Sequence, residues 1–93
     1  MKAFSLEDFS GSVGQSYELV AGDHLFPMTL EAAEALPHSL REGGAFRLSW
    51  RGPEAPVLPQ AIYTFRREGE EMEMFIVPVG RDSTGTEYEA IFN

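Results

Sequence analysis

The chain contains no cysteine, and this absence excludes several kinds of chemistry at once. Without thiols there can be no disulfide, no thiolate metal ligand and no cysteine nucleophile. Because small secreted domains commonly depend on disulfides, the absence favours a reducing compartment. We therefore expect a cytoplasmic protein, which a larger assembly could still carry elsewhere.

Histidine is almost as scarce, since the chain has only His24 and His38. Two histidines that lie far apart, with no cysteine beside them, are poor material for a zinc site. A nucleophilic triad needs a histidine next to both a hydroxyl and an orienting acid. His24 follows an aspartate in an expected turn and His38 lies in an expected loop, so we predict no catalytic residue.

Basic residues are few: 7 lysines and arginines stand against 15 aspartates and glutamates, which gives a net charge of −8. Phosphate backbones and anionic membrane surfaces repel such a chain, so we expect neither nucleic acid nor membrane as a partner. No apolar run approaches the ~20 residues that span a bilayer. The first residues also lack the apolar core of a signal peptide.

The length of 93 residues and the 43% hydrophobic content predict one globular domain over residues 1–93. Residues 4–11 predict a short N-terminal helix. Ser5 can cap it with Asp8 reaching back, and Phe4 and Phe9 occupy the positions of a hydrophobic staple. Because fewer than two turns fit, packing has to hold this helix in place.

The rest of the chain alternates in the manner of β-strands. Residues 15–21 and the segment that starts at His24 predict a hairpin around a Gly-Asp turn, with Leu19 opposite Phe26 and Tyr17 opposite Met28. Phe46, Leu48 and Trp50 alternate with polar residues, which indicates one buried and one solvent-exposed face.

Residues 28–36 read in two ways. Their alanine and glutamate content favours a helix, whereas their alternation and the preceding hairpin turn favour a strand. We choose the strand and keep the helix as the alternative. Residues 37–44 predict a loop, and residues 52–60 predict a stiff loop because their three prolines lack amide donors.

The clearest hairpin surrounds Glu68 and the glycine that follows it. A two-residue turn there pairs opposite charges and apolar side chains together: Arg67 with Glu70, Arg66 with Glu71, Phe65 with Met72, Tyr63 with Met74 and Ile62 with Phe75. A slip of one residue would lose every pair. Residues 74–79 are apolar on both faces, which predicts a central strand covered on both sides, with Pro78 at a bulge or strand end.

A polar turn over residues 80–85 and a final strand over residues 86–92 complete the pattern. The sum is an all-β class: a small antiparallel barrel or a two-layer sandwich of about six strands, with one short N-terminal helix. The first or last strand is expected to form an unpaired edge, through which a homo-oligomer could form.

Four glutamates form the only candidate site that the pattern suggests. Glu71 and Glu73 share one strand face, as do Glu87 and Glu89, and neighbouring strands could bring the two pairs together. Paired carboxylates can serve in glycoside hydrolysis. Acidic residues opposite an apolar face, however, usually form the solvent-exposed face of a sheet. We therefore predict a surface for a protein partner, with no cofactor and no catalytic role.

A calcium loop is the nearest alternative for a metal. Residues 81–87 contain Asp82 and Glu87, but an arginine stands where a ligand is needed, so we expect a solvated turn and no metal.

Several motifs in the C-terminal third resemble a known family. They are Leu58-Pro59-Gln60, Tyr63, the run from Phe75 to Gly80, Tyr88-Glu89-Ala90 and Phe92-Asn93. The chain resembles small bacterial proteins of this length that are classed as a domain of unknown function. Ala61 and Arg67 depart from the pattern, which expects glycine and histidine. The resemblance implies a loose association with genes for phage-tail-like or collar-type proteins, and no catalytic residues.

Three functions remain open at this point. The first is a non-enzymatic structural or interaction module, an accessory of a phage-tail-like or fibre assembly. The second is a small acidic inhibitor or immunity-type protein that covers a basic partner. The third is a small ligand-binding barrel, which would need a concave pocket with convergent polar groups.

Overall fold

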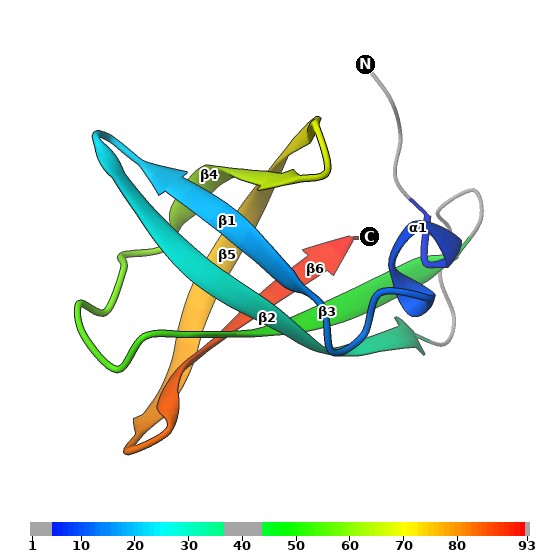
Figure 1. Cartoon of the computed structure of the whole chain (residues 1–93). Helices are drawn as coiled ribbons and strands as arrows, with labels where there is room; N and C mark the ends of the chain where they lie inside the picture. Colours follow the sequence, from blue (N-terminus) through cyan, green and yellow to red (C-terminus); the bar gives the residue numbers. More distant parts are fainter. Residues whose placement is uncertain (1–4, 37–43, 93) are drawn as a thin grey trace.

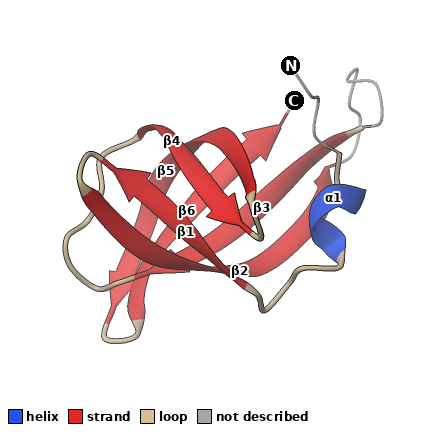
Figure 2. Ribbon diagram, turned by 45° about the horizontal axis from the view of Figure 1, so that its top comes forward, coloured by secondary structure: helices blue, strands red, loops and turns tan. Residues whose placement is uncertain are grey.

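The described residues of the computed structural model, 5–36 and 44–92, form a closed antiparallel β-barrel with one short helix (Figures 1 and 2). Its elements are α1 (Glu7–Ser10), β1 (Ser16–Ala21), β2 (His24–Leu36), β3 (Ala45–Gly52), β4 (Ala61–Arg67), β5 (Glu70–Asp82) and β6 (Gly85–Phe92). Around the barrel the strands follow the order β1-β2-β3-β6-β5-β4. The all-β class is confirmed, and the choice between barrel and sandwich is decided for the barrel.

The hairpin of β1 and β2 has the predicted register. Leu19 lies opposite Phe26 and Tyr17 opposite Met28. Gly22 has a φ of 62°, a conformation that glycine adopts without steric cost at the first position of such a turn.

Residues 28–36 are strand, as chosen over helix. Met28 and Leu30 are completely buried, and the register against β3 then shifts between Leu30 and Ala32. Glu31 is the additional residue of this β-bulge. Tertiary burial of alternate side chains thus overrides the helical preference of the alanines and glutamates.

The hairpin of β4 and β5 is confirmed pair by pair. Its register runs from Arg67 opposite Glu70 to Ala61 opposite Ile76, and it includes every pair that the sequence predicts. Glu68 has a φ of 52° and Gly69 a φ of 81°. Positive φ at both central residues is the mark of a type I′ turn, whose twist matches that of the flanking strands.

Large apolar side chains fill the barrel. The completely buried ring of Trp50 packs edge-on against Tyr17, with ring centroids 4.9 Å apart. Its centroid lies 4.7 Å from that of Phe65. The buried core is Phe9, Tyr17, Leu19, Met28, Leu30, Phe46, Leu48, Trp50, Leu58, Phe65, Met74, Ile76, Tyr88 and Ala90. In small barrels the interior is occupied by side chains in this way.

Helix α1 covers one end of the barrel. Phe9 is completely buried, and its ring lies 6.1 Å from that of Phe46 and 6.3 Å from that of Phe92. The carboxylate of Asp8 accepts a hydrogen bond of 2.8 Å from the backbone N–H of Ser5, which is the expected reach-back. The Ser5 side chain does not cap the helix in return, and the staple residue Phe4 lies outside the described residues.

The proline-containing loop over residues 53–60 covers the opposite end. The backbone N–H of Leu58 donates a hydrogen bond of 2.9 Å to the hydroxyl oxygen of Tyr88. The Tyr63 hydroxyl donates to the carbonyl of Pro59 at 2.7 Å. The loop contains no strand, as its prolines predict.

Two expectations about β5 are wrong. Residues 74–79 are not covered on both faces, because Phe75 is 51% exposed and Val79 is 52% exposed. The predicted turn over residues 80–85 is also too long, since β5 continues to Asp82 and β6 begins at Gly85. The register shift between Pro78 and Gly80 confirms the bulge expected near Pro78.

The expected edge strand is also absent, since each strand of the barrel has two neighbours. β1 pairs with both β2 and β4, and β6 pairs with both β3 and β5. The seam between β1 and β4 is short, from Glu18 opposite Arg66 to Val20 opposite Thr64. Closure therefore removes the complete edge that the first or last strand was expected to present.

Candidate functional site

The four glutamates of the predicted partner surface do not form one cluster. The pairing of β5 with β6 places Glu89 opposite Val77, which is four residues from Glu73. At ~3.3 Å per residue, the two levels lie about 13 Å apart along the strand. Glu71 and Glu73 therefore lie towards one end of the barrel, and Glu87 and Glu89 towards the other.

Three of these four carboxylates have an arginine partner on an adjacent strand. The ion pairs are Glu71–Arg66 at 2.9 Å, Glu87–Arg51 at 3.6 Å and Glu89–Arg47 at 3.2 Å. Glu73 forms no ion pair with any lysine or arginine of the described residues. The free charge of the predicted surface is thus much smaller than the sequence indicates.

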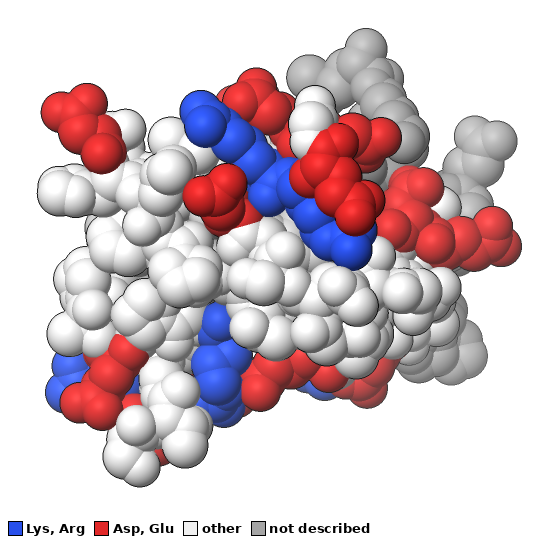
Figure 3. Space-filling model, in the orientation of Figure 1, with Lys and Arg blue, Asp and Glu red and all other residues white. Residues whose placement is uncertain are grey.

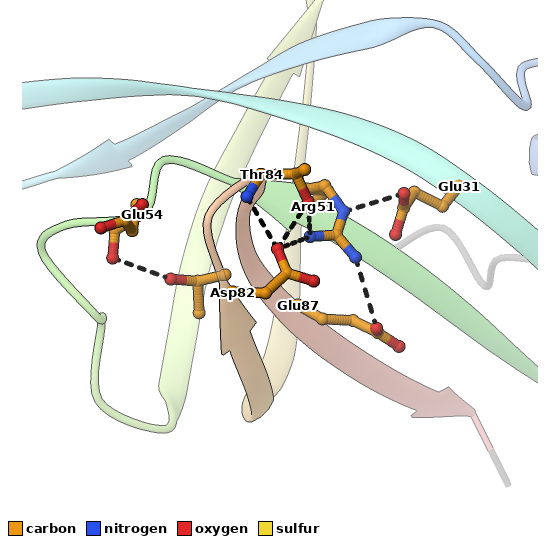
Figure 4. A network of polar contacts seen from close by, with 7 residues as sticks. Glu31, Arg51, Glu54, Asp82, Thr84 and Glu87 are labelled. Carbon is orange, nitrogen blue, oxygen red and sulfur yellow. Dashed lines mark hydrogen bonds and ion pairs between the residues drawn. The ribbon is translucent and has the colours of Figure 1, made fainter.

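Arg51 is the centre of the largest polar network, which joins three parts of the barrel (Figure 4). Its Nε donates to Glu31 of β2 at 2.9 Å, and its Nη1 donates to Asp82 at 3.1 Å and to the Thr84 hydroxyl at 2.8 Å. The guanidinium thereby holds the β5–β6 turn against β2 and β3. Its donors are used within the molecule, which indicates a structural role.

The nearest candidate for a calcium ligand belongs to this network. Asp82 accepts hydrogen bonds from the hydroxyl and the backbone N–H of Thr84 as well as from Arg51. These bonds, with those from Thr84 the strongest, lower the pKa of Asp82 below its usual value. An arginine therefore takes the place that a cation would need. The described residues hold no group of three His, Cys, Asp or Glu side chains suited to a metal.

The outside of the barrel carries several apolar residues, among them Phe75, which was expected in a strand covered on both sides. Ile62 of β4 lies directly opposite Phe75 of β5, and the two side chains are 65% and 51% exposed. Two residues further along β4 from Ile62 is Thr64, which lies opposite Val20 of β1. Val20 in turn lies opposite Leu25 of β2, which is 51% exposed. We call Val20, Leu25, Ile62 and Phe75 the apolar outer face.

Figure 3 shows how uncharged and charged surfaces divide on the side of the barrel that carries β1 and β2. A broad white area occupies this side, and acidic and basic side chains gather along its upper and lower borders. White includes uncharged polar residues, so the apolar outer face is defined by its four residues and not by this white area.

Two carboxylates border the apolar outer face without an ion-pair partner among the described residues. Glu18 lies two residues from Val20 on the same face of β1, and Glu73 lies two residues from Phe75 on the same face of β5. The register sets Glu73 opposite Thr64. Arg66, opposite Glu18, also borders this face, so the border is mixed, and its two unpaired carboxylates favour an apolar partner that carries basic residues.

A cleft of about 280 Å³ lies between α1 and the turn of the β4–β5 hairpin. Its walls are Asp8, Phe9, Ser12, Tyr17, Arg67, Glu68, Glu70 and Met72. Arg67 spans it, since its guanidinium carbon lies 5.4 Å from the centre of the Tyr17 ring and its Nη1 lies 3.4 Å from Glu68. The cleft is small for a drug-sized ligand, and its one cation is already engaged.

His24 does not join any of these groups. His24 is exposed at the β1–β2 turn, and its ring centroid lies 6.1 Å from that of Phe26. His38 lies outside the described residues. In the part of the chain that the structure describes, no helix is long and apolar enough to cross a membrane.

The fold and these surfaces define a class: a small β-barrel with a packed interior, whose candidate binding site lies on its outside. The chain belongs to the family described as domain of unknown function DUF6916, whose model matches residues 4–92. The resemblance to a domain of unknown function is thereby confirmed. Comparison with curated proteins and with solved structures gave no match.

Sequence reasoning placed the acidic residues on the correct strands but missed the apolar outer face. The signal was present, because residues 74–79 are apolar at every position and Ile62 pairs with Phe75 in the predicted register. We read this signal as burial of a central strand on both sides. The sheet of a closed barrel buries only its inner face, so apolar residues on its outer face are exposed to solvent.

Proposed function

We propose that this protein is a non-enzymatic interaction module, and that it binds a partner protein through the apolar outer face. In this proposal it acts in the cytoplasm as an accessory of a larger assembly, such as a phage-tail-like or fibre particle. The resemblance of the C-terminal motifs supports a role in such an assembly, and the absence of cysteine supports a reducing compartment.

The observation that carries the proposal is the pair of exposed residues Ile62 and Phe75. An aromatic ring beside a β-branched side chain is a favourable cross-strand pair and also a good anchor for a partner. Val20 and Leu25 extend the same surface across β1 and β2. Scattered exposed apolar residues need no explanation, but the exposed Leu25, Ile62 and Phe75, together with the half-buried Val20, form one surface on neighbouring strands.

The two alternatives receive less support from the structure. A small acidic inhibitor would need free carboxylates, yet Glu71, Glu87 and Glu89 each have an arginine partner. A ligand-binding barrel would need room inside, yet Trp50 and Tyr88 fill the interior and both ends are covered. The cleft beside α1 remains the place where such a ligand would bind.

Photo-crosslinking in the native cells tests the proposal. A benzoylphenylalanine residue at Thr64, between the apolar positions of β1 and β5, should crosslink to one partner in high yield. The Ile62→Ser variant should lose this complex and keep its unfolding temperature, because exposed substitutions change stability by only about 0.5 kcal/mol. The matched control is Val13→Ser, which removes an apolar side chain that is 46% exposed outside this face. If Ile62→Ser retains the complex, the apolar outer face is not the binding site.

A further inference from the structure

Strand β5 has an open backbone edge along its first half. It pairs with β4 from Glu70 to Ile76, but its pairing with β6 begins only at Val77, opposite Glu89. Figure 1 shows β6 diverging from β5 on its way to the C-terminus. The side of β5 that faces away from β4 therefore has no strand of the described residues beside it from Glu70 to Ile76.

The hairpin geometry tells which residues point their backbone groups towards this edge. In a two-residue turn the flanking residues, here Arg67 and Glu70, form a hydrogen-bonded pair. Hydrogen-bonded and non-hydrogen-bonded pairs then alternate along an antiparallel ladder. Glu71, Glu73 and Phe75 fall on the non-hydrogen-bonded positions, so their N–H and C=O groups point away from β4.

Within residues 5–36 and 44–92, the strand registers give these backbone groups no partner. None of the backbone hydrogen bonds outside the regular strands involves Glu71, Glu73 or Phe75. An edge of this kind is a template for pairing with another chain unless a proline or a covering element blocks it, and charged side chains such as Glu71 and Glu73 restrict the pairing to strands of complementary charge. No proline lies between Glu70 and Val77, and the three side chains are exposed.

The side chains along the edge select the chemistry of the added strand. Glu71, Glu73 and Phe75 share the outer face of β5, and Glu73 has no ion-pair partner among the described residues. A neighbouring strand would place its own alternate residues directly beside them. A basic residue beside Glu73 and an apolar residue beside Phe75 complement this row, whereas Glu71 already pairs with Arg66 at 2.9 Å. A second copy of this chain fits poorly, because two chains with a net charge of −8 repel each other.

We propose that an extended basic segment of the partner protein adds to β5 as a strand along Glu71, Glu73 and Phe75. The inference rests on the proposed function, because it names the binding mode of the same partner on the adjoining surface. Backbone hydrogen bonds supply affinity in such strand addition, and the alternate side chains supply specificity.

Amide hydrogen exchange of the free protein provides the first test. The amides of Glu71, Glu73 and Phe75 should exchange much faster than those of Met72 and Met74, which face β4. Equal protection of all five amides would mean that the edge is closed, and would overturn the proposal.

Binding of a probe peptide provides the second test. The probe has about seven residues, alternating lysine with valine, and the control peptide has glutamate in place of lysine. NMR titration should show saturable shifts and new protection at the three edge amides with the lysine peptide, weakened at least tenfold between about 0.05 and 0.5 M salt. No shift at millimolar peptide, or equal binding of the glutamate peptide, would overturn the proposal.

Variants separate the backbone contribution from the charge. Glu73→Pro removes one N–H that points to the open edge and should abolish peptide binding, whereas Glu73→Gln keeps the N–H and should weaken binding several-fold. Glu54→Gln removes the same charge from the exposed loop over residues 53–60, beside Thr86 and outside both proposed surfaces, and should leave binding unchanged. If Glu73→Pro folds and still binds fully, the strand does not add at this edge.

The native complex distinguishes failure of this inference from failure of the proposed function. If Ile62→Ser loses the crosslinked partner and Glu73→Pro retains it, the apolar outer face binds without strand addition. If both variants retain the partner, the proposed function itself fails. Loss of the partner with both variants supports both proposals.

Discussion

The hydroxyl oxygen of Tyr88, on β6, accepts a hydrogen bond of 2.9 Å from the backbone N–H of Leu58. Both residues are buried, so this bond is shielded from water and ties the proline-containing loop over one end of the barrel. A backbone donor inside the protein that loses its acceptor costs more free energy than the bond contributes when present.

We therefore expect Tyr88→Phe to lower the free energy of unfolding by about 1–3 kcal/mol, because it leaves the Leu58 N–H without an acceptor. Urea unfolding measures the change. Tyr63→Phe is the matched control, since the Tyr63 hydroxyl donates to the Pro59 carbonyl of the same loop in a solvent-exposed bond. A loss as large in the control as in Tyr88→Phe would show that burial of the donor is not the cause.

Gly85 should not tolerate a side chain. Its φ is 139°, and a β-carbon built there would overlap the backbone oxygen of Gly52 on β3. We expect Gly85→Ala to destabilise the fold by at least about 2 kcal/mol, because neither backbone can yield without breaking the pairing of β3 with β6. Gly80→Ala, where a β-carbon meets nothing within 4 Å, should change stability far less. Thermal unfolding compares the two, and equal unfolding temperatures would contradict the prediction.

The Arg51 network should contribute stability that depends on pH. The pKa of Asp82 is lowered in the folded state by hydrogen bonds from Thr84 and Arg51. A group of this kind contributes its full stability above its unfolded pKa, and the contribution is lost as the pH falls through the folded value. The unfolding temperature of the native protein should therefore exceed that of Asp82→Asn near neutral pH, and the difference should shrink below about pH 4.

Thermal unfolding between neutral pH and about pH 2 measures this difference. Asp23→Asn is the control, because it removes a carboxylate from the β1–β2 turn, outside the network. A difference for Asp82→Asn that stays constant over this range would argue against a charge effect.

Phe9 should hold α1 against the barrel. The helix has only four residues, which is too short for a stable helix by itself, so its position depends on the buried ring. We expect Phe9→Ala to cost about 3–5 kcal/mol and to release α1, since it leaves a cavity beside the stacked rings of Phe46 and Phe92. Calorimetry measures the loss and amide exchange of residues 7–10 reports the release. Val13→Ala, at an exposed position, should do neither.

The local parts of this fold could be predicted because neighbouring residues carry the signal. The β4–β5 register follows from the pairing of Arg67 with Glu70 and of Phe65 with Met72, and the structure reproduces it. The strand nature of residues 28–36 could also be chosen, although their composition favours a helix. Alternation of buried side chains decides such cases, and it is visible in the sequence.

The candidate site could be predicted only in part, because it depends on distant pairings. The sequence shows that Glu87 and Glu89 share a face, but not that Arg51 and Arg47 lie beside them across β3 and β6. It shows apolar residues at positions 62 and 75, but not that nothing covers them. The open edge of β5 depends on where β6 separates from it, beyond the pair of Val77 and Glu89. No local sequence pattern marks this point.

The sequence by itself determined the β class, the hairpin registers and the acidic character of this protein. Turn residues and period-two alternation act over a few positions, so their outcome is settled before the chain closes. Only the tertiary structure decided that β1 meets β4 to close the barrel, which carboxylates receive an arginine, and which apolar side chains remain outside. Those outcomes depend on contacts between residues far apart in the chain, where curvature and closure of the whole sheet determine the neighbours.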